Sequence, residues 1–262
     1  MQRRRESTTF RLRPSRARLA RTTGDKHDMA TTGHTVKAFD SDLGQIRGLV
    51  SEMGGRAEAA ITASIQALQR IDLEAAAQVV QEDRKIDELE TEVERQVIRL
   101  IALRAPLADD LRDAVAALKI SGVIERIGDY AKNIAKRVPL LAEMRTSEPM
   151  AILPAMARSV SDMVRGALDA YAARDAVGAV AVQEADRHVD DFYNSLFRTL
   201  LTYMMENPTS ITESAHLLFI AKNLERIGDH ATNIAEMVFF AATGEQLIDR
   251  PRGGDPLTAD AE

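Results

Sequence analysis

Apolar residues return every three or four positions along most of the chain, the spacing of a helix buried on one face. The first such run consists of Val36, Phe39, Leu43, Ile46, Val50, Met53 and Ala57. The pattern continues to about Ile71, and Asp72 then stands as the N-cap of a second helix that ends at Ala105-Pro106. A third helix is expected from about Leu107 to Leu141.

The pattern restarts in the second half of the chain. Asp175 stands as an N-cap 103 residues after Asp72, and Asn207-Pro208 breaks the chain as Ala105-Pro106 did. The segments ERIGDYAKNIA from Glu125 and ERIGDHATNIA from Glu225 are identical at nine of eleven positions. This is a tandem duplication of a three-helix unit. We therefore expect an all-α protein of two tandem three-helix bundles, with six long helices.

Domain boundaries follow from the same pattern. The first three-helix repeat is expected over residues 34–146 and the second over residues 147–247, with a flexible tail over residues 248–262. Residues 1–33 lack helical periodicity at their start and are interpreted either as a disordered basic tail or as a start-site artefact. A fresh stretch, MATTGHTVKAFD, opens at Met29 and leads into the first helix.

Composition agrees with a helical chain and removes several classes of site. Only 4% of the 262 residues are aromatic and 14 are glycine, too few for a β-sandwich or barrel. The absence of cysteine excludes disulfide frameworks, zinc ribbons and thiolate-bound iron–sulfur clusters. No apolar stretch is long enough to span a membrane. We expect a soluble, cytoplasmic protein.

Charge is distributed unevenly. Residues 1–28 carry a net charge of +6, whereas residues 29–262 hold 25 Lys/Arg and 37 Asp/Glu, a net charge of -12. An acidic body of this kind argues against nucleic-acid binding, because phosphate contacts need clustered Lys and Arg. It is compatible with the binding of cations.

Each repeat carries two carboxylate pairs at i and i+4. They are Asp83/Asp87 and Glu125/Asp129 in the first repeat, and Asp186/Asp190 and Glu225/Asp229 in the second. Residues four apart share a helix face, where two like charges cost a few tenths of a kcal/mol. Recurrence of the pairs at equivalent positions predicts a compensating multivalent cation, held by oxygen ligands.

A helical wheel turns these carboxylates away from the main apolar seam, so we expect a cluster on the outside of each bundle. Asn133 and Asn233 extend the same face by one turn and are candidates to ligate the ion or to bond a ligating carboxylate. Gly128 and Gly228 weaken a helix interior and are interpreted as points of close approach by a neighbouring backbone.

Two other functional classes stay open at this point. A carboxylate-bridged di-metal oxidase would need Glu-x-x-His motifs with carboxylates inside the bundle, and no such motif accompanies these pairs. A purely structural helical scaffold would leave the acidic faces merely solvated. No nucleotide-binding or hydrolase motif occurs, and we expect no catalytic or organic-cofactor residue.

The doubled ERIGDxAxNIA, with an upstream DxxxD in each copy, resembles the PhoU family of phosphate-specific transport system accessory proteins. The segments HTVKAFD from His34, LLTYMMENP from Leu200 and GEQLIDR from Gly244 are similar to that family as well, so the resemblance covers about residues 30–250. It implies two spectrin-like three-helix bundles related by pseudo-two-fold symmetry. It also implies surface metal clusters of iron, zinc, manganese or magnesium on the eight carboxylates.

The same resemblance implies a regulatory function. Proteins of this family restrain the Pho regulon when phosphate is plentiful and modulate phosphate uptake. They link the ABC phosphate transporter, through a PstB-like ATPase, to a PhoR-like sensor histidine kinase. The expectation for this chain is therefore a non-enzymatic adaptor that forms homodimers and reaches the membrane only through its partners.

Overall fold

The computed structural model describes residues 28–142 and 151–247, with side chains from residue 38 onward. Six long helices dominate these ranges and no strand occurs in them. The helical elements are α1 (Asp28–Arg70), α2 (Leu73–Arg104), α3 (Ala108–Ala135), α4 (Val138–Leu141), α5 (Leu153–Ala173), α6 (Ala176–Glu206), η2 (Pro208–Ser210) and α7 (Ile211–Thr243).

The predicted N-caps of the second helix of each repeat are confirmed. The Asp72 carboxylate accepts a hydrogen bond from the Ala75 backbone N–H at 3.0 Å, and that of Asp175 accepts from the Val177 N–H at 2.9 Å. Such caps satisfy backbone donors that have no partner within the first turn. Equivalent residues thus begin α2 and α6.

The third helix is shorter than its periodicity predicts. It ends at Ala135 and not at Leu141, and α4 follows as a separate turn. Pro139 lies in the first turn of α4, where its missing N–H costs least. An uninterrupted helix would have needed that N–H for a hydrogen bond to the carbonyl of Ala135, so the proline separates the two elements.

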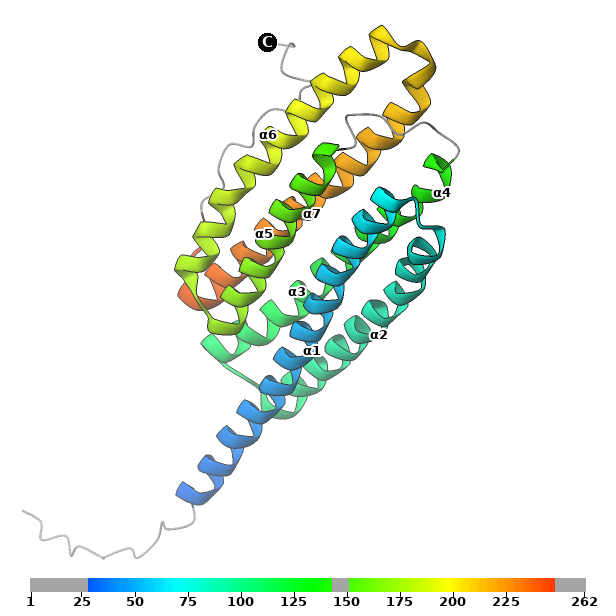
Figure 1. Ribbon diagram of the computed structural model, residues 1–262. Coiled ribbons are helices and arrows are strands. Elements are labelled where there is room, and N and C mark those ends of the chain that lie inside the picture. Colours follow the sequence, from blue (N-terminus) through cyan, green and yellow to red (C-terminus); the bar gives the residue numbers. More distant parts are fainter. Residues whose placement is uncertain (1–27, 143–150, 248–262) are drawn as a thin grey trace, which may run out of the picture.

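The helices form successive layers (Figure 1). In the first repeat α1 and α3 pack side by side, with α2 on their outer side; in the second repeat α5 and α7 do the same beneath α6. The repeats meet where α3 packs on α7 and α1 packs on α5. The α2–α3 and α6–α7 connections lie at opposite ends of the molecule (Figure 1).

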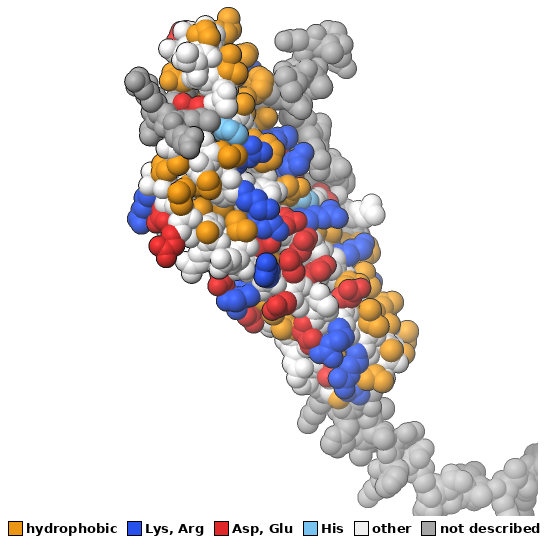
Figure 2. Space-filling model, turned by 90° about the vertical axis from the view of Figure 1, so that its right-hand side faces the viewer, with side chains coloured by type: hydrophobic (Ala, Val, Ile, Leu, Met, Phe, Trp, Pro, Cys, Tyr) orange, Lys and Arg blue, Asp and Glu red, His pale blue; other side chains and the backbone are white. Residues whose placement is uncertain are grey.

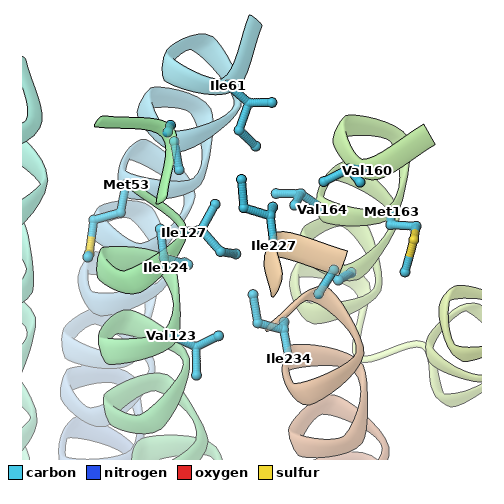
Figure 3. Close-up of a cluster of buried hydrophobic side chains, with 14 of the residues drawn as sticks. Met53, Ile61, Val123, Ile124, Ile127, Val160, Met163, Val164, Ile227 and Ile234 are labelled. Atoms are coloured by element: carbon cyan, nitrogen blue, oxygen red, sulfur yellow. The ribbon is translucent and has the colours of Figure 1, made fainter. Parts of the chain in front are cut away.

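A single hydrophobic core runs through both repeats. Figure 3 shows Ile127 of α3 and Ile227 of α7 next to each other, with Ile61 of α1 and Val164 of α5 beside them. All four side chains are fully buried. Truncation of such a residue to alanine costs about 2–5 kcal/mol, so the contact between repeats is part of the core.

The helix pair α3/α7 shows the predicted pseudo-two-fold symmetry. Tyr130 stacks on His230, its equivalent in the second repeat, with ring centroids 5.4 Å apart. The Arg226 guanidinium lies 5.8 Å from the Tyr130 ring. In the other direction, burial and then the positive charge of Arg126 lower the pKa of His230. Equivalent residues therefore face each other across an axis between the two antiparallel helices.

The ends of the helical body differ slightly from the expected boundaries. Helix α1 begins at Asp28, so residues 28–33 are helical although the sequence boundary fell after residue 33. Helix α7 ends at Thr243, with Gly244 in a left-handed conformation at φ 78°. Residues 1–27 and 248–262, expected to be tails, lie outside the described residues. No helix within the described ranges is long and apolar enough to cross a membrane.

Candidate functional site

The structure places the carboxylate pairs of each repeat on two adjacent helices. Two surfaces can be defined: the first face, on α2 and α3, and the second face, on α6 and α7. The first face consists of Asp83, Asp87, Glu125 and Asp129, and the second face of Asp186, Asp190, Glu225 and Asp229. Acidic and basic side chains lie intermixed across the middle of the side of the molecule shown in Figure 2.

Glycine allows the two helices of each face to approach. A Cβ atom on Gly128 would lie 2.8 Å from Ile86 Cδ1 and 3.3 Å from the Asp83 carboxylate. A Cβ atom on Gly228 would lie 3.3 Å from the Asp186 carboxylate. The expected close approach is present, but side chains of α2 and α6 make it and not a neighbouring backbone. The missing methyl groups leave room for the first Asp of each DxxxD.

The exposure of the carboxylates departs from the helical-wheel expectation. Asp87 is exposed as predicted, whereas Asp83 retains only 5% of its accessible surface. Asp83 is buried because it packs over Gly128, within the contact between α2 and α3. A wheel drawn for one helix identifies its own apolar seam but not the surface that a second helix covers.

The carboxylates of the first face repel one another. Burial raises the pKa of Asp87, and the neighbouring carboxylates of Asp83 and Asp129 raise it further, while Lys132 lowers it. Burial likewise raises the pKa of Glu125, with Asp129 and Asp87 as the main charged neighbours. Carboxylates from both helices are therefore close enough to disfavour one another's ionised forms.

Lys132 of α3 supplies a cation at the first face. Its ammonium group forms ion pairs with Asp83 of α2 and with Asp129 one turn before it. Burial lowers the pKa of Lys132, but hydrogen bonds to Asp129 and Asp83 outweigh it and raise the pKa above its ordinary value. Lys132 is thus a protonated bridge between the helices. It lies outside the carboxylate motifs, and sequence reasoning missed it.

The second face has a different arrangement. Thr232 occupies the position equivalent to Lys132, and its hydroxyl donates to the Asp229 carbonyl at 2.7 Å. Lys222 donates to Glu225 Oε1 at 2.8 Å from one turn earlier on the same helix. The other carboxylate oxygen, Glu225 Oε2, is buried and has no hydrogen-bond partner. Burial raises the pKa of Glu225, Lys222 lowers it, and Asp229 and Asp190 raise it.

The donor atoms have the chemistry for hard divalent cations, which bind oxygen ligands. In the part of the chain that the structure describes, however, no three His, Asp or Glu side chains converge closely enough to hold an ion. Side-chain rotation would be needed to close a site. The second face fits this requirement better, because it combines the space at Gly228 with the unpartnered Glu225 oxygen.

The two asparagines lie beside the contact between repeats. Asn133 and Asn233 are half-buried, and the Asn233 amide lies 3.3 Å from His230 Nδ1. Burial lowers the pKa of His230, with Arg126 as the main charged cause. The structure therefore associates Asn233 with the Tyr130–His230 stack. The expected contact of Asn133 or Asn233 with a carboxylate or a bound ion stays a prediction.

A groove of about 850 Å³ lies elsewhere on the second repeat, between α5 and α6. Its lining is mainly apolar, including Met163, Val182 and Phe192, with Asp162 and Asp191 among the polar side chains. The second face lies on the other flank of α6, toward α7. The groove is therefore separate from the carboxylates.

Comparison with known proteins gives one consistent family. The family model described as the PhoU domain matches twice, over residues 50–138 and 153–238. A protein of Zymomonas mobilis named as a phosphate-specific transport system accessory protein PhoU homolog is 60% identical over 228 residues, covering 87% of this chain and 96% of that protein. A homolog of the same name from Caulobacter vibrioides is 49% identical over 226 residues, covering 84% and 97%.

Solved structures agree. The crystal structure of PhoU from Pseudomonas aeruginosa superposes with a TM-score of 0.76 at 36% identity, covering 79% of this chain and all of that one. The phosphate transport system regulatory protein PhoU from Streptococcus pneumoniae superposes with a TM-score of 0.75 at 27% identity, covering 80% and 99%. The matches span both repeats.

Proposed function

Because this chain belongs to the PhoU family, we propose that it is an accessory regulator of phosphate transport that restrains the phosphate-starvation response when phosphate is plentiful. The observation that carries the proposal is the match of the family domain to both repeats, supported by a relative that is 60% identical along nearly its whole length. The protein acts by contact with other proteins and is not an enzyme.

The contacts are with a PstB-like ATPase of the phosphate transporter and a PhoR-like sensor histidine kinase. An adaptor needs separate surfaces for separate partners, and the duplicated fold supplies them. The α2–α3 end carries exposed Leu103 and Leu107, whereas the opposite α6–α7 end carries exposed Met205 and Ile211 (Figure 1). Exposed apolar side chains at both ends support protein contacts there.

We further propose that the protein works in the cytoplasm as a homodimer and binds iron, zinc, manganese or magnesium on its acidic surface. Oxygen donors from two helices per repeat support metal binding, as do the raised pKa values of Asp87, Glu125 and Glu225, which come first from burial and then from neighbouring carboxylates. A bound ion would supply positive charge that lowers the repulsion between these carboxylates. Gly128 and Gly228 let the two helices of each face approach, so that carboxylates from both helices could share one ion.

Deletion of the gene tests the regulatory proposal. Phosphate-starvation genes should stay switched on in phosphate-rich medium, and a plasmid copy of the full chain should switch them off again. A reporter for a starvation-induced promoter measures both effects. If the deletion strain represses the reporter as the parent strain does, the regulatory proposal is wrong.

One observation favours a second candidate for part of the molecule. Lys132 already balances Asp83 and Asp129, so the first face can be a structural element that needs no metal. A protein with two such faces would be a helical scaffold with solvated or lysine-paired carboxylates. Elemental analysis of the purified chain after incubation with Mn²⁺ separates this candidate from a metal-binding regulator.

A further inference from the structure

The helix pairs α1/α2 and α5/α6 are equivalent in the two repeats, yet their outer surfaces differ. On the first pair, Glu82 of α2 lies 3.9 Å from Arg56 of α1, so a contact between charged side chains crosses the surface. The equivalent positions on the second pair, 103 residues later, hold Ala185 and Ser159. Both line the groove of about 850 Å³. The fold therefore does not require a hollow between these helices, and the side chains of the second repeat create it.

The groove has an apolar floor. Met163 of α5 and Val182 of α6 are only 3% and 6% exposed, and the partly buried Phe192 lines the groove beside them. Gly166 lets the two helices approach, because a Cβ atom there would lie 3.2 Å from Val182 Cγ2. Apolar hollows of this size that are open to solvent typically mark binding surfaces.

The shape of the groove suits a helix. It follows α6 from Gly178 to Ser195, beside α5 (Figure 1), a length of about 26 Å at 1.5 Å per residue. A helix of about 18 residues has this length. The small side chains of Ser159, Ala181 and Ala185 leave room for the backbone of a third helix to come close. An amphipathic helix that lays its apolar side in such a groove is a common mode of protein recognition.

Carboxylates give the groove a negative charge. Asp162 of α5 and Asp191 of α6 are exposed, and the residues described as lining the groove include no lysine or arginine. Arg165 reaches Asp162 at 3.4 Å, but both side chains are exposed and the pair is well screened. Lys or Arg side chains on an incoming helix would meet complementary charge, whereas Asp or Glu side chains would be repelled.

We propose that the groove binds an amphipathic helix of a partner protein, with basic side chains beside Asp162 and Asp191. The apolar side of that helix lies on Met163, Val182 and Phe192. The inference deepens the adaptor proposal, on which it rests, by naming one docking surface and the chemistry of its partner. The contact is specific to the second repeat, because charged side chains cross the equivalent surface of the first.

Binding of a labelled synthetic peptide to the purified full chain, followed by fluorescence anisotropy, tests the proposal. The peptide has about 18 residues and forms an amphipathic helix with Leu and Ala on one side and Lys on the other. A second peptide has Glu in place of each Lys. The chain should bind the Lys peptide at least about tenfold more tightly than the Glu peptide. Equal affinities, or no binding of the Lys peptide, would contradict the proposal.

Variants that carry the residues of the first repeat test the location. Ser159→Arg combined with Ala185→Glu fills the groove without changing the net charge, and should weaken binding of the Lys peptide at least about tenfold. Ala181→Gln introduces the residue of position 78 at the rim and should weaken binding as well. Circular dichroism checks that each variant keeps its helices, and Ala181→Gln decides the question if the double variant does not fold. Unchanged affinity in the folded variants would overturn the proposal.

A matched pair of charge reversals separates the groove from the acidity of the whole chain. Asp191→Lys and Glu88→Lys make the same change at equivalent exposed positions of the two repeats. Asp191→Lys should weaken binding of the Lys peptide severalfold at low salt, whereas Glu88→Lys should leave it nearly unchanged. Equal weakening would show that the peptide responds to net charge, and would overturn the groove as its site.

Two other occupants are outcomes of the same experiments. Removal of residues 248–262 should leave the affinity for the Lys peptide unchanged, and tighter binding would show that this segment of the chain itself fills the groove. Light scattering should give the same mass for the wild type and the double variant. A smaller mass for the double variant would show that a second copy fills the groove. Either result would overturn the proposal.

The reporter strain links the groove to the proposed function. In the deletion strain, the Ser159→Arg, Ala185→Glu double variant should fail to repress the starvation reporter, whereas Glu88→Lys should repress it as the wild type does. Full repression by the double variant would show that the adaptor does not use the groove. A deletion strain that represses the reporter unaided would remove the proposed function, and the peptide experiments would then decide the groove separately.

Discussion

The two carboxylate faces have the same motifs but balance their negative charge differently. On the first face Lys132 bridges the two helices from a half-buried position, so an internal cation offsets the repulsion. On the second face Lys222 pairs with Glu225 within α7, and the other oxygen of that carboxylate has no hydrogen-bond partner. Equivalent motifs therefore do not make equivalent sites, because residues outside the motif decide the charge balance.

Removal of each lysine should give the largest difference between the faces. Lys132→Met would leave Asp83, which is 5% exposed, as a buried charge without its cross-helix partner. Breaking a buried ion pair costs about 3–5 kcal/mol, and the partial exposure of Lys132 places the expected loss at about 2–4 kcal/mol. Loss of the Lys222–Glu225 pair in Lys222→Met should contribute less than about 1 kcal/mol, because the pair lies within one helix and Lys222 is partly exposed.

Urea unfolding followed by circular dichroism, without added metal, measures both values. Asp83→Asn combined with Lys132→Met serves as a control, since it removes the buried charge together with its partner. Its loss should be smaller than that of Lys132→Met alone. Equal losses for the two lysine variants would show that the faces are balanced in the same way after all.

The glycines should give the next largest difference. In Gly128→Ala the new methyl group would meet Ile86 at 2.8 Å, and Ile86 is almost fully buried, so the α2–α3 contact must shift. Overpacking of this kind costs about 1–3 kcal/mol, against a gain of about 1 kcal/mol in helix propensity. Gly228→Ala meets its nearest atoms at 3.3 and 3.4 Å and should be nearly neutral.

Thermal unfolding of the two alanine variants and the wild type checks this order. The expected net loss for Gly128→Ala is about 1 kcal/mol, which corresponds to a few degrees in a domain of this size. Gly128→Ser serves as a second variant, because it adds a still larger side chain and should lose more. A Gly228→Ala variant less stable than Gly128→Ala would show that α6 lies closer to α7 than α2 does to α3.

The sequence alone predicted the helical architecture and identified the helices that carry the carboxylates. Its period of three to four located the helices, and the aspartates at 72 and 175 located two of their starts. These features depend on local sequence and on one buried face per helix. Family resemblance added the pseudo-two-fold relation, which the Tyr130–His230 stack makes concrete.

Contacts between helices could not be read in the same way. Asp83 was expected on an outer face, yet α3 covers it, since Gly128 lets the helices approach. Lys132 had no recurring partner in the second repeat, so repeat comparison gave it no weight although it is central to the first face. The signal that could have identified Lys132 is its difference from Thr232 at the equivalent position of the second repeat.

A smaller difference should appear in the pH dependence of stability. The folded-state pKa of Glu225 is raised, so its contribution is favourable when the group is protonated and is lost as the pH rises through that pKa. The wild type should therefore lose stability at this position as the pH rises above the ordinary glutamate pKa of 4.5. Glu225→Gln should be more stable than the wild type at pH 7, by on the order of 1 kcal/mol, with a flatter pH profile.

The first face should instead respond at high pH. The raised pKa of Lys132 means that its favourable contribution is fully present below the ordinary lysine pKa of 10.5 and is lost as the pH rises above it. Unfolding midpoints of the wild type, Glu225→Gln and Lys132→Met, recorded from pH 5 to 11, test both statements. A Glu225→Gln profile parallel to that of the wild type would remove Glu225 from the explanation.

The smallest effect is expected where the repeats differ most visibly at the surface. On the first repeat Glu82 pairs with Lys85 at 2.6 Å and lies 3.9 Å from Arg56, whereas the equivalent Ala185 and Ser159 line the apolar groove of the second repeat. These ion pairs are exposed, and water and salt screen such pairs strongly.

Glu82→Ala should therefore shift the urea midpoint by no more than the error of the measurement, and by less still in 1 M salt. A clear loss at low salt that disappears in 1 M salt would show that charge balance contributes to stability on this surface too. The contrast between the repeats would then extend beyond the carboxylate faces to the packing of α1 on α2.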